Sequence, residues 1–305
     1  MIHQSRKILI TGAGGYVAKE LIRQMLIYTN NLIVTVSSDK NKVREELSDL
    51  HCDERITCFS REEALDNTIP WTTIDIVVHL AFARKQFPQN ELVESLIFSK
   101  KVFQQVLNTK VPALINVSSQ SIYGSAPGLH REDSFPCPLD FYSLSKCANE
   151  IILDAVFYNT RATKVTNIRL DSIAGNKNLI PSLVRQGIED RTIKLIGGEQ
   201  VFSLLDVRDA ASGILAMCRS DPSKWESAYN LGRNDCTYTL VEVANWVKET
   251  LKKHGISDIS ISLEKRDIKT YAGMDSTKIT ALTGWIPQYD IEDIIETEVT
   301  KQLKR

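Results

Sequence analysis

The stretch Lys7–Ala18, KILITGAGGYVA, constrains the fold more than any other part of the 305-residue chain. Its apolar run Ile8–Ile10 predicts a strand that is buried on both faces. The turn Thr11–Gly15 contains only small residues, and apolar residues then recur at helical spacing, so we expect a helix to begin near Tyr16. A strand, a glycine-rich turn and a helix N-terminus together form a site for a phosphate, because the backbone can approach the ligand and its free N–H groups face the anion. A glycine-rich turn without a ligand is the alternative.

Composition excludes several classes of partner. Hydrophobic residues make up 43% of the chain and charged residues 25%, as in an ordinary globular protein of one large or two modest domains. A formal net charge of −1 without a basic block argues against nucleic acid or an anionic membrane as partner. The six cysteines form no C-x-x-C pair, so we expect reduced thiols and no metal site. No signal peptide and no apolar run of about 18 residues is present, so a cytoplasmic location is expected.

Apolar runs and amphipathic segments alternate regularly through the first 170 residues. Helical spacing predicts helices over 91–109 and from near Asp140 onward. Strands are expected, after the first one, at 32–36, 56–59, 74–83, 113–117 and 165–170. Each strand is apolar throughout, as in a parallel sheet that helices cover on both faces. The order predicts an α/β fold, a Rossmann-type doubly wound parallel sheet with right-handed crossovers.

From about Asp171 the pattern changes. The following ranges are expected to be helical: 180–190, 206–219, 240–253 and 291–303, with strand-like runs at 193–196 and 259–263. We therefore divide the chain into a nucleotide-binding Rossmann domain over residues 1–170 and a smaller α/β lobe over 171–305. The lobe is expected to bind substrate at the edge of the sheet, and some of its segments are expected to return to the first domain.

The end of the second strand bears on which dinucleotide the fold would bind. In dinucleotide-binding folds an acidic residue here accepts from the ribose 2′-OH of NAD, whereas its absence beside cations tolerates the 2′-phosphate of NADP. The chain has Ser37 and Ser38 at this point, with Asp39 one step later and Lys40 close behind. The pattern leans to NADP. The alternative is that Asp39 bends back to the ribose.

Small and polar residues end the fourth predicted strand. His79 lies inside an apolar run, so we expect a packed, hydrogen-bonded histidine rather than a catalytic one. Ala81 and Ala83 follow it and leave room for a ligand at the carboxyl end of the strand, which is where open α/β sheets bind one.

Tyr142 and Lys146 are four residues apart and therefore share one face of a predicted helix. A tyrosine with an ordinary pKa of about 10 is a poor base at neutral pH, but a nearby ammonium stabilises its phenolate. Ser119, at the end of the preceding strand, can hold a substrate oxygen beside that phenolate. The trio can remove a proton from a sugar or alcohol hydroxyl while a hydride leaves the same carbon for nicotinamide. A surface pair of side chains is the alternative.

Four motifs occur in a fixed order along the chain: TGAGGYVA at 11–18, DIVVHLA at 75–81, VSSQSIYG at 117–124 and YSLSK at 142–146. Together they resemble the extended branch of the short-chain dehydrogenase/reductase superfamily. More narrowly, they resemble the NAD-dependent epimerase/dehydratase family, which acts on nucleotide sugars. Three later segments are similar to further landmarks of that family: LLDVRDAA at 204–211, YNLG at 229–232 and LTGWIP at 282–287. The resemblance therefore covers nearly the whole chain.

The resemblance implies roles for individual residues. Tyr142 matches the catalytic base, Ser119 the active-site Ser/Thr, and Lys146 the partner of the base, which in the family also holds the nicotinamide ribose. Ala18 replaces the usual last glycine of the cofactor turn and adds only a methyl group. Contacts with NAD or NADP are expected from Gly12, Gly14, Gly15, Tyr16, Val17, Ser37, Ser38, Lys40, Leu80, Ala81, Ala83, Ser118, Tyr142 and Lys146.

Positions that bear on the substrate depart from the family pattern. Ser95 and Ser172 stand where the family often has asparagine, and Phe202 stands where it has the arginine that clamps the diphosphate. Other groups replace a bidentate phosphate donor poorly, although Arg185 or Arg208 are candidates to do so. Two explanations stay open: drift within a nucleotide-sugar enzyme, or a different and smaller substrate.

The residues after Ser119 bear on the reaction. Family dehydratases place an Asp-Glu pair there, whereas this chain has Gln120 and Ser121, which serve as neither acid nor base, so dehydration is disfavoured. We expect NAD(P)-dependent hydride transfer at a sugar carbon, with 4-epimerisation of a nucleotide-linked sugar ahead of NADP-dependent reduction of a keto sugar or other carbonyl compound. An NAD(P)-binding sensor or scaffold without catalysis is the alternative of another class. Relatives pair the helices that correspond to 91–109 and 141–158, which implies a homodimer.

Overall fold

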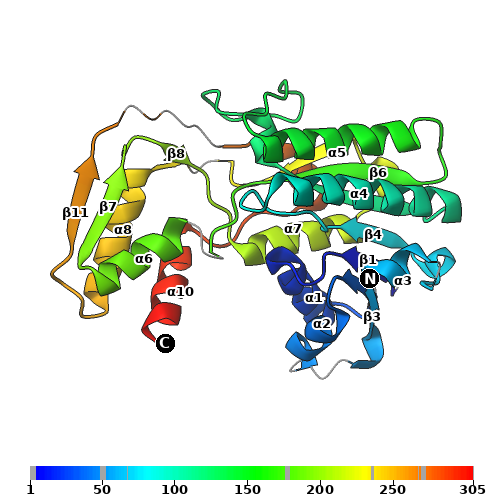
Figure 1. Ribbon diagram of the computed structural model, residues 1–305, viewed down its shortest axis with the longest axis horizontal. Coiled ribbons are helices and arrows are strands. Elements are labelled where there is room, and N and C mark those ends of the chain that lie inside the picture. The colour runs from blue at the N-terminus through cyan, green and yellow to red at the C-terminus, as the bar shows by residue number, and fades with distance from the viewer. Residues whose placement is uncertain are drawn as a thin grey trace.

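The computed structural model describes residues 5–48, 53–66, 68–175, 179–234, 237–266, 268 and 273–304. A larger α/β body contains the central sheet, and a smaller body with α6, β7, α8, α10 and β11 lies beside it (Figure 1). None of the helices in these residues is long and apolar enough to span a membrane.

The central sheet has seven strands, and all of its neighbouring pairs are parallel. The strands lie in the order β3-β2-β1-β4-β5-β6-β9, with bounds β1 (Lys7–Thr11), β2 (Leu32–Ser37), β3 (Ile56–Ser60), β4 (Ile76–His79), β5 (Ala113–Ser119), β6 (Lys164–Leu170) and β9 (Ala228–Leu231). The strand order reverses between β1 and β4, and open α/β sheets bind ligands at the carboxyl ends of the strands beside such a point. The predicted doubly wound fold is therefore confirmed.

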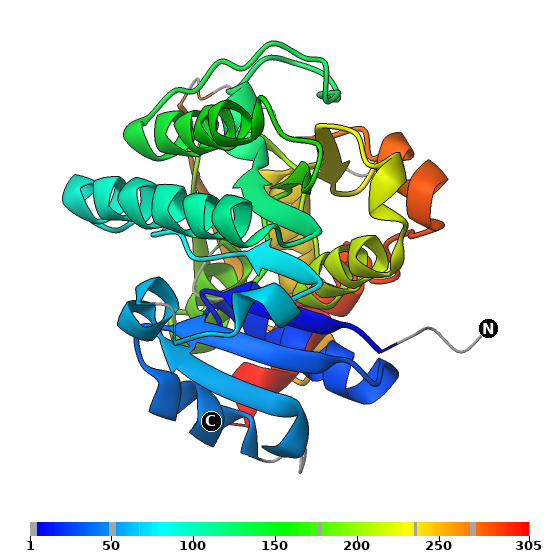
Figure 2. The ribbon, with the colours of Figure 1, turned by 90° about the vertical axis from the view of Figure 1, so that its right-hand side faces the viewer.

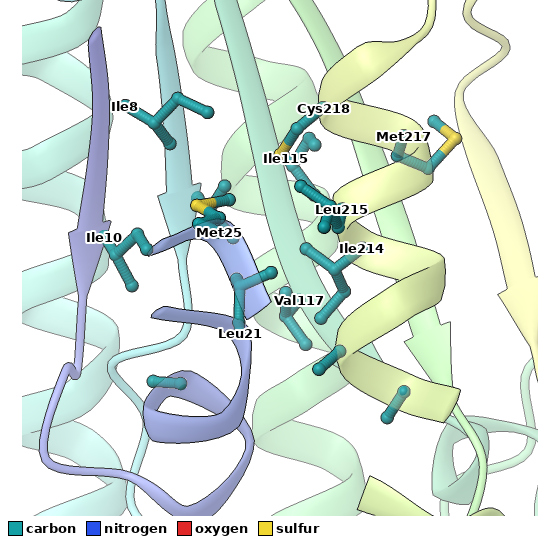
Figure 3. Packing of buried hydrophobic residues seen from close by; sticks show 14 of the residues in the cluster. Ile8, Ile10, Leu21, Met25, Ile115, Val117, Ile214, Leu215, Met217 and Cys218 are labelled. Carbon is teal, nitrogen blue, oxygen red and sulfur yellow. The ribbon is translucent and has the colours of Figure 1, made fainter. Parts of the chain in front are cut away.

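Helices cover both faces of the sheet, as Figure 2 shows with α4 and α5 on one side and α7 on the other. Side chains of β1 alternate between the two layers, because successive residues of a strand point to opposite faces. Ile8 and Ile10 pack with α1 and α7 (Figure 3), whereas Leu9 packs with α4 and α5. The helices of this body are α1 (Tyr16–Tyr28), α2 (Lys40–Glu46), α3 (Arg61–Leu65), α4 (Gln89–Thr109), α5 (Phe141–Phe157), α7 (Val207–Arg219) and α9 (Thr277–Thr283).

The smaller body has a core of its own, in which buried side chains of three helices meet. It contains α6 (Leu179–Glu189), β7 (Thr192–Ile196), α8 (Leu240–Lys253), β11 (Ser260–Glu264) and α10 (Ile291–Leu303), and β7 pairs with β11 in parallel. A short antiparallel pair joins β8 (Val201–Phe202) to β10 (Tyr238–Thr239). Short 3₁₀ turns lie at Asp53–Arg55, Trp71–Thr73, Gln120–Tyr123 and Pro222–Lys224. The segments α7, β9 and α9 follow residue 171 but pack with the central sheet. The division of the chain into two domains at residue 171 therefore stays a prediction from the sequence.

The fourth strand is shorter than predicted. The apolar run 74–83 indicates a ten-residue strand, but β4 spans only Ile76–His79. Beyond it the backbone N–H groups of Ala81 and Ala83 turn to side-chain oxygens, Thr11 Oγ1 at 3.3 Å and Ser95 Oγ at 2.9 Å. Serine and threonine hydroxyls here replace the sheet ladder, so an apolar run alone does not show where the strand ends.

A buried ion pair connects β6 to α5, the helix that carries Tyr142 and Lys146. The Arg169 guanidinium contacts the Glu150 carboxylate through Nη2 at 2.8 Å and through Nε at 3.2 and 3.3 Å. Both side chains are only 9% exposed. Arg169 also donates to the Tyr123 hydroxyl at 2.7 Å and to the Glu132 carbonyl at 2.9 Å. This arginine therefore connects three segments around the end of the sheet.

We expect Glu150→Ala to lower the free energy of unfolding by about 3–5 kcal/mol, because it leaves the Arg169 cation buried without its carboxylate. Urea denaturation of the purified protein measures the change. Glu249→Ala is the matched control: it breaks the 4.0 Å contact of Glu249 with Lys252, whose side chains are 59% and 62% exposed, and should lower the free energy of unfolding by less than about 1 kcal/mol. Equal losses for the two variants would contradict this role of the buried pair.

Candidate active site

The glycine turn after β1 has the backbone shape that a phosphate site requires. Gly12 has a φ of 69°, and a Cβ there would lie 2.7 Å from the backbone nitrogen of Ala81. Gly15 donates to the Gly12 carbonyl at 2.8 Å, and a Cβ on Gly15 would lie 3.0 Å from that oxygen. Gly15 is also the N-cap of α1, so no side chain caps the first turn of this helix. Its N–H groups are thus available to an anion. Gly14 is exposed, and its nearest neighbour is the Val43 side chain.

The end of β2 holds an unsatisfied polar group. The Ser37 side chain is 6% exposed, and its Oγ has no hydrogen-bond partner among the described residues. Ser38 is exposed. Asp39 accepts from the Lys42 N–H at 2.9 Å as N-cap of α2. Lys40 contacts Glu63 at 2.6 Å, so its ammonium already has a carboxylate partner.

Other predicted cofactor residues divide between the site and the core. Ser118 is 3% exposed, and its Oγ has no partner within the described part of the chain. The Tyr16 hydroxyl lies 2.8 Å from where a Cβ on Gly175 would stand, so Tyr16 reaches the segment after β6. Val17 and Leu80 pack against the core. The glycine cradle and the orphaned hydroxyls of Ser37 and Ser118 fit a dinucleotide along this edge of the sheet.

His79 is packed and hydrogen-bonded, as predicted. Its Nδ1 lies 2.8 Å from Thr11 Oγ1, and its Nε2 lies 2.8 Å from Ser99 Oγ. Ser99 donates its proton to the Ser95 carbonyl at 2.7 Å, so it accepts from Nε2–H, and Thr11 donates to Nδ1. Burial lowers the pKa of His79 to about 3, which keeps the ring neutral. The histidine therefore links β1 to α4 below the segment of Ala81.

Ser119 and Tyr142 meet at the carboxyl end of β5. Ser119 is the last residue of that strand, and Tyr142 lies in the first turn of α5. Burial raises the pKa of Tyr142, a hydrogen bond with the Ser119 side chain acts to lower it, and the charge of Asp140 raises it. The predicted base and the Ser119 hydroxyl therefore lie near each other at this edge of the sheet.

Lys146 is buried one helical turn further along α5. Its side chain is 6% exposed, and Nζ donates to the Val117 carbonyl at 2.9 Å. Nζ also lies 4.2 Å from the centre of the Phe82 ring. That ring in turn stands edge-on to Tyr142 with centres 6.5 Å apart. Burial lowers the pKa of Lys146 to about 7. Ser119, Tyr142 and Lys146 therefore gather at one place, as the sequence predicts.

The start of α5 is held by Asp140. Its carboxylate accepts from the Ser143 N–H at 2.8 Å, and the Ser143 hydroxyl lies 3.0 Å from the Asp140 N–H, which completes a capping box. Lys85 contacts the same carboxylate at 2.7 Å. Burial acts to raise the pKa of Asp140, but hydrogen bonds from Lys85 and Ser143 outweigh it and hold the pKa at about 2. This cap fixes the turn that carries Tyr142.

Polar side chains lie beyond Ser119 on the substrate side. Gln120 donates from Nε2 to Ser172 Oγ at 2.7 Å, which joins the ends of β5 and β6. Asp171 is 3% exposed and accepts from the Ser203 hydroxyl and from the Ser172 N–H. Burial raises the pKa of Asp171 to about 6 although these hydrogen bonds lower it. The Ser172 hydroxyl thus accepts from the neutral Gln120 amide, and the Ser172 N–H donates to Asp171.

Of the two candidate replacements for the diphosphate clamp, Arg208 is already engaged. It binds the Asp206 carboxylate at 2.8 and 2.9 Å, and its guanidinium lies 3.5 Å from the centre of the Tyr289 ring. Arg185 is exposed on α6 and stays a candidate. Phe202 pairs with Tyr238 through β8 and β10.

Sequence reasoning missed the roles of two residues at the site. Asp140 precedes the apolar pattern of α5, and Ser143 follows three residues later. This spacing is a signal in the sequence for a helix N-cap at Asp140. Phe82 lies between two alanines of a segment that faces the ligand edge, and only its size distinguished it. No local pattern shows that its ring meets Lys146, because that contact depends on the packing of α5.

Comparison with known proteins agrees with this geometry. The model of the NAD dependent epimerase/dehydratase family matches residues 8–232. A dTDP-4-dehydro-6-deoxyglucose reductase of Escherichia coli is 23% identical over 309 residues, which cover 95% of this chain and 95% of the relative. A dTDP-glucose 4,6-dehydratase of Haemophilus influenzae is 22% identical and covers 93% of this chain and 94% of its own.

Solved structures share the fold over the whole chain. The UDP-Glc/GlcNAc 4-epimerase of Campylobacter jejuni superimposes with a TM-score of 0.82 at 20% identity, over 99% of this chain and 100% of that one. The UDP-glucuronic acid 4-epimerase of Bacillus cereus, solved with UDP-glucuronic acid and NAD, superimposes with a TM-score of 0.80 at 20% identity, over 97% and 99% of the two chains. The family match covers well over half of the chain, and the glycine turn and the Ser119–Tyr142–Lys146 cluster lie within it. The protein is therefore a member of the NAD dependent epimerase/dehydratase family.

Proposed function

We propose that the protein transfers a hydride between a dinucleotide and a carbinol or keto carbon of a sugar, as a 4-epimerase of a nucleotide-linked sugar. The proximity of the Ser119 and Tyr142 side chains carries this proposal, because proton exchange with a sugar hydroxyl needs a base and a hydrogen-bond donor side by side. The buried Lys146 lies one turn away on the same helix. A scaffold that only binds the cofactor would have no use for this cluster.

Each member of the cluster has a separate role. Tyr142 accepts the proton of the sugar hydroxyl at its Oη, and Ser119 holds the same sugar oxygen by a hydrogen bond. Lys146, when protonated, stabilises the phenolate form of Tyr142 and is placed to hold the nicotinamide ribose. The nicotinamide, when bound, supplies the acceptor and donor of the hydride. Tyr142 then returns the proton to the sugar oxygen when the keto carbon is reduced.

Two reactions use this cluster, and we place epimerisation first. An epimerase keeps its cofactor bound while the keto sugar rotates in the site, whereas a reductase releases the oxidised cofactor after each cycle. The solved neighbours include 4-epimerases, and the curated relatives include a reductase, so reduction of a keto sugar is the second candidate. Cofactor that stays bound through purification would favour the epimerase.

Dehydration is not part of the proposal. The Gln120 amide is neutral and donates to Ser172, and Ser121 carries a hydroxyl, so neither residue supplies the acid or base that elimination of water needs. The relatives include dehydratases, and Gln120 and Ser121 are the residues that argue against that reaction in this chain.

We propose a nucleotide sugar as the substrate. Nucleotide sugars are the ligands of structural neighbours such as the Bacillus cereus epimerase, and we carry that class over to this chain. Phe202 and the engaged Arg208 leave the diphosphate without the clamp that the family resemblance implies. Arg185 is the remaining side chain that we propose for this role. A cytoplasmic location stays a prediction of the sequence.

Replacing Tyr142 by phenylalanine should reduce turnover of keto-sugar nucleotides with NADH by about 10²–10⁴-fold, because the variant lacks the group that exchanges the proton. Cofactor oxidation measured at 340 nm, with affinity for NADH measured separately, gives both readouts. Tyr158→Phe is the matched control, since Tyr158 follows the same helix and is 85% exposed, and it should behave as wild type. If wild type binds NADH but turns over no sugar nucleotide or keto sugar, the sensor or scaffold reading replaces the enzyme.

We propose that the cofactor is NAD, whereas the residues at the end of β2 favour NADP when only the sequence is considered. Several of the solved neighbours were obtained with NAD, such as the UDP-glucuronic acid 4-epimerase of Bacillus cereus. In the structure Lys40, the first cation after β2 along the chain, is paired with Glu63, so a 2′-phosphate would compete with a carboxylate for it.

We expect NADH to bind at least about tenfold more tightly than NADPH, as measured by fluorescence titration. Glu63→Ala should reduce the difference in affinity between NADH and NADPH, because it frees the Lys40 ammonium from its carboxylate partner. Glu46→Ala removes the partner of Lys19 instead and should leave the preference unchanged. Tighter binding of NADPH by wild type would overturn the proposal.

We also propose a homodimer through α4 and α5, which lie side by side on the outside of the sheet (Figures 1 and 2). Apolar side chains stay exposed on both helices: Val93 and Ile97 at 42% each, Leu144 at 52% and Ile151 at 63%. Two copies of this pair would bury these side chains in a four-helix interface.

Sedimentation velocity at micromolar concentration should show a dimer of wild type and a monomer of Ile151→Asp, because a carboxylate cannot be buried in an apolar interface without large cost. Leu303→Asp, on α10 and 40% exposed, is the control and should stay dimeric. A monomeric wild type would refute the proposed interface.

A further inference from the structure

Phe82 stands apart from its neighbours in the segment that follows β4. It lies between Ala81 and Ala83, both of which were expected to leave room for a ligand. Its ring instead lies beside two residues of the cluster. The ring centre is 4.2 Å from Lys146 Nζ. It is 6.5 Å from the centre of the Tyr142 ring, and the two ring planes meet at 78°. A bulky aromatic residue therefore contacts the side chain that is placed to hold the nicotinamide ribose.

The ring occupies one side of the Lys146 ammonium and closes that side to a ribose oxygen. Lys146 is 6% exposed and donates one hydrogen bond, to the Val117 carbonyl at 2.9 Å. An ammonium has three N–H donors, and a ribose hydroxyl must approach within about 3 Å of the nitrogen to accept from one of them. No oxygen fits between the nitrogen and a ring face whose centre is 4.2 Å away. The ribose reaches Lys146 from this side only if the ring moves.

The backbone around Phe82 is anchored on both sides. The Ala81 N–H donates to Thr11 Oγ1 at 3.3 Å, and Thr11 is held in turn by His79. The Ala83 N–H donates to Ser95 Oγ at 2.9 Å, and Ser95 donates to the Glu91 carbonyl at 2.8 Å. These contacts hold the segment to β1 and α4, so rotation of its own side chain, rather than movement of the loop, is the motion open to the ring.

We propose that Phe82 sets the affinity of the protein for its dinucleotide: its ring covers the Lys146 ammonium in the free protein and rotates away to admit the ribose diol. This inference rests on the proposed role of Lys146 in holding that ribose. Each binding event replaces the contact between cation and ring, so part of the binding free energy is spent on uncovering Lys146.

The test is the affinity of Phe82→Ala for NADH, measured by fluorescence titration and by calorimetry without any sugar present. Without the ring the ammonium is open before the cofactor arrives, so we expect the Kd to fall by about three- to tenfold. Phe82→Leu keeps a bulky side chain but has no π face, and its Kd should lie between those of wild type and Phe82→Ala. Phe87→Ala is the matched control, because its ring meets Arg84 at 5.6 Å in the same segment, and its Kd should equal that of wild type.

Weaker binding by Phe82→Ala would mean that the ring packs against the bound cofactor, and it would overturn the inference. Thermal unfolding shows whether Phe82→Ala folds, and if it does not, Phe82→Leu decides: an unchanged or higher Kd overturns the inference. NADH binding that tightens in the variants without turnover of any sugar leaves the inference standing and removes the proposed reaction. Turnover combined with weaker binding does the reverse. Failure of wild type and both variants to bind NADH overturns the inference.

Discussion

The parallel pairing of β1, β4 and β5 is the constraint on which the rest of the structure depends. Parallel strands end at one edge of a sheet, so Thr11, His79 and Ser119 arrive there from segments far apart in the chain. The glycine turn follows one of these strands, and Ser119, the proposed catalytic serine, ends another. Only α5 must then be placed against that edge to bring Tyr142 and Lys146 to Ser119. The remaining elements hold this arrangement in place.

Buried polar groups do much of that holding. Thr11, His79 and Ser99 form a chain of hydrogen bonds from β1 to α4, and Glu150 and Arg169 link α5 to β6. Burying a polar group without a hydrogen-bond partner costs free energy, so each of these links favours the packing in which its two segments meet. These links anchor the backbone around the site. Adaptation to a ligand then falls to side chains, and Phe82 is the side chain placed to respond.

The two halves of the site differ in how they relate to the family. The cofactor half has its glycines, its open helix terminus and two buried hydroxyls without partners among the described residues, Ser37 and Ser118. The substrate half has Gln120 bound to Ser172, and Phe202 where a cation is expected. Chemistry at the sugar carbon needs only the cluster on β5 and α5, whereas recognition of the rest of the substrate depends on the second half. The reaction is therefore better specified than its substrate.

The sequence by itself determined the doubly wound fold, the glycine turn and the residues of the proposed catalytic cluster, because strand and helix periodicity and motif spacing are local properties. The packed state of His79 was also predictable from the apolar run around it. Only the tertiary structure decided that β4 stops at His79, that Lys40 pairs with Glu63, that Arg208 is engaged by Asp206, and that Phe82 meets Lys146. Each of these depends on which partner a side chain or N–H group meets across the fold. Sequence spacing holds no information about such partners until the segments are packed.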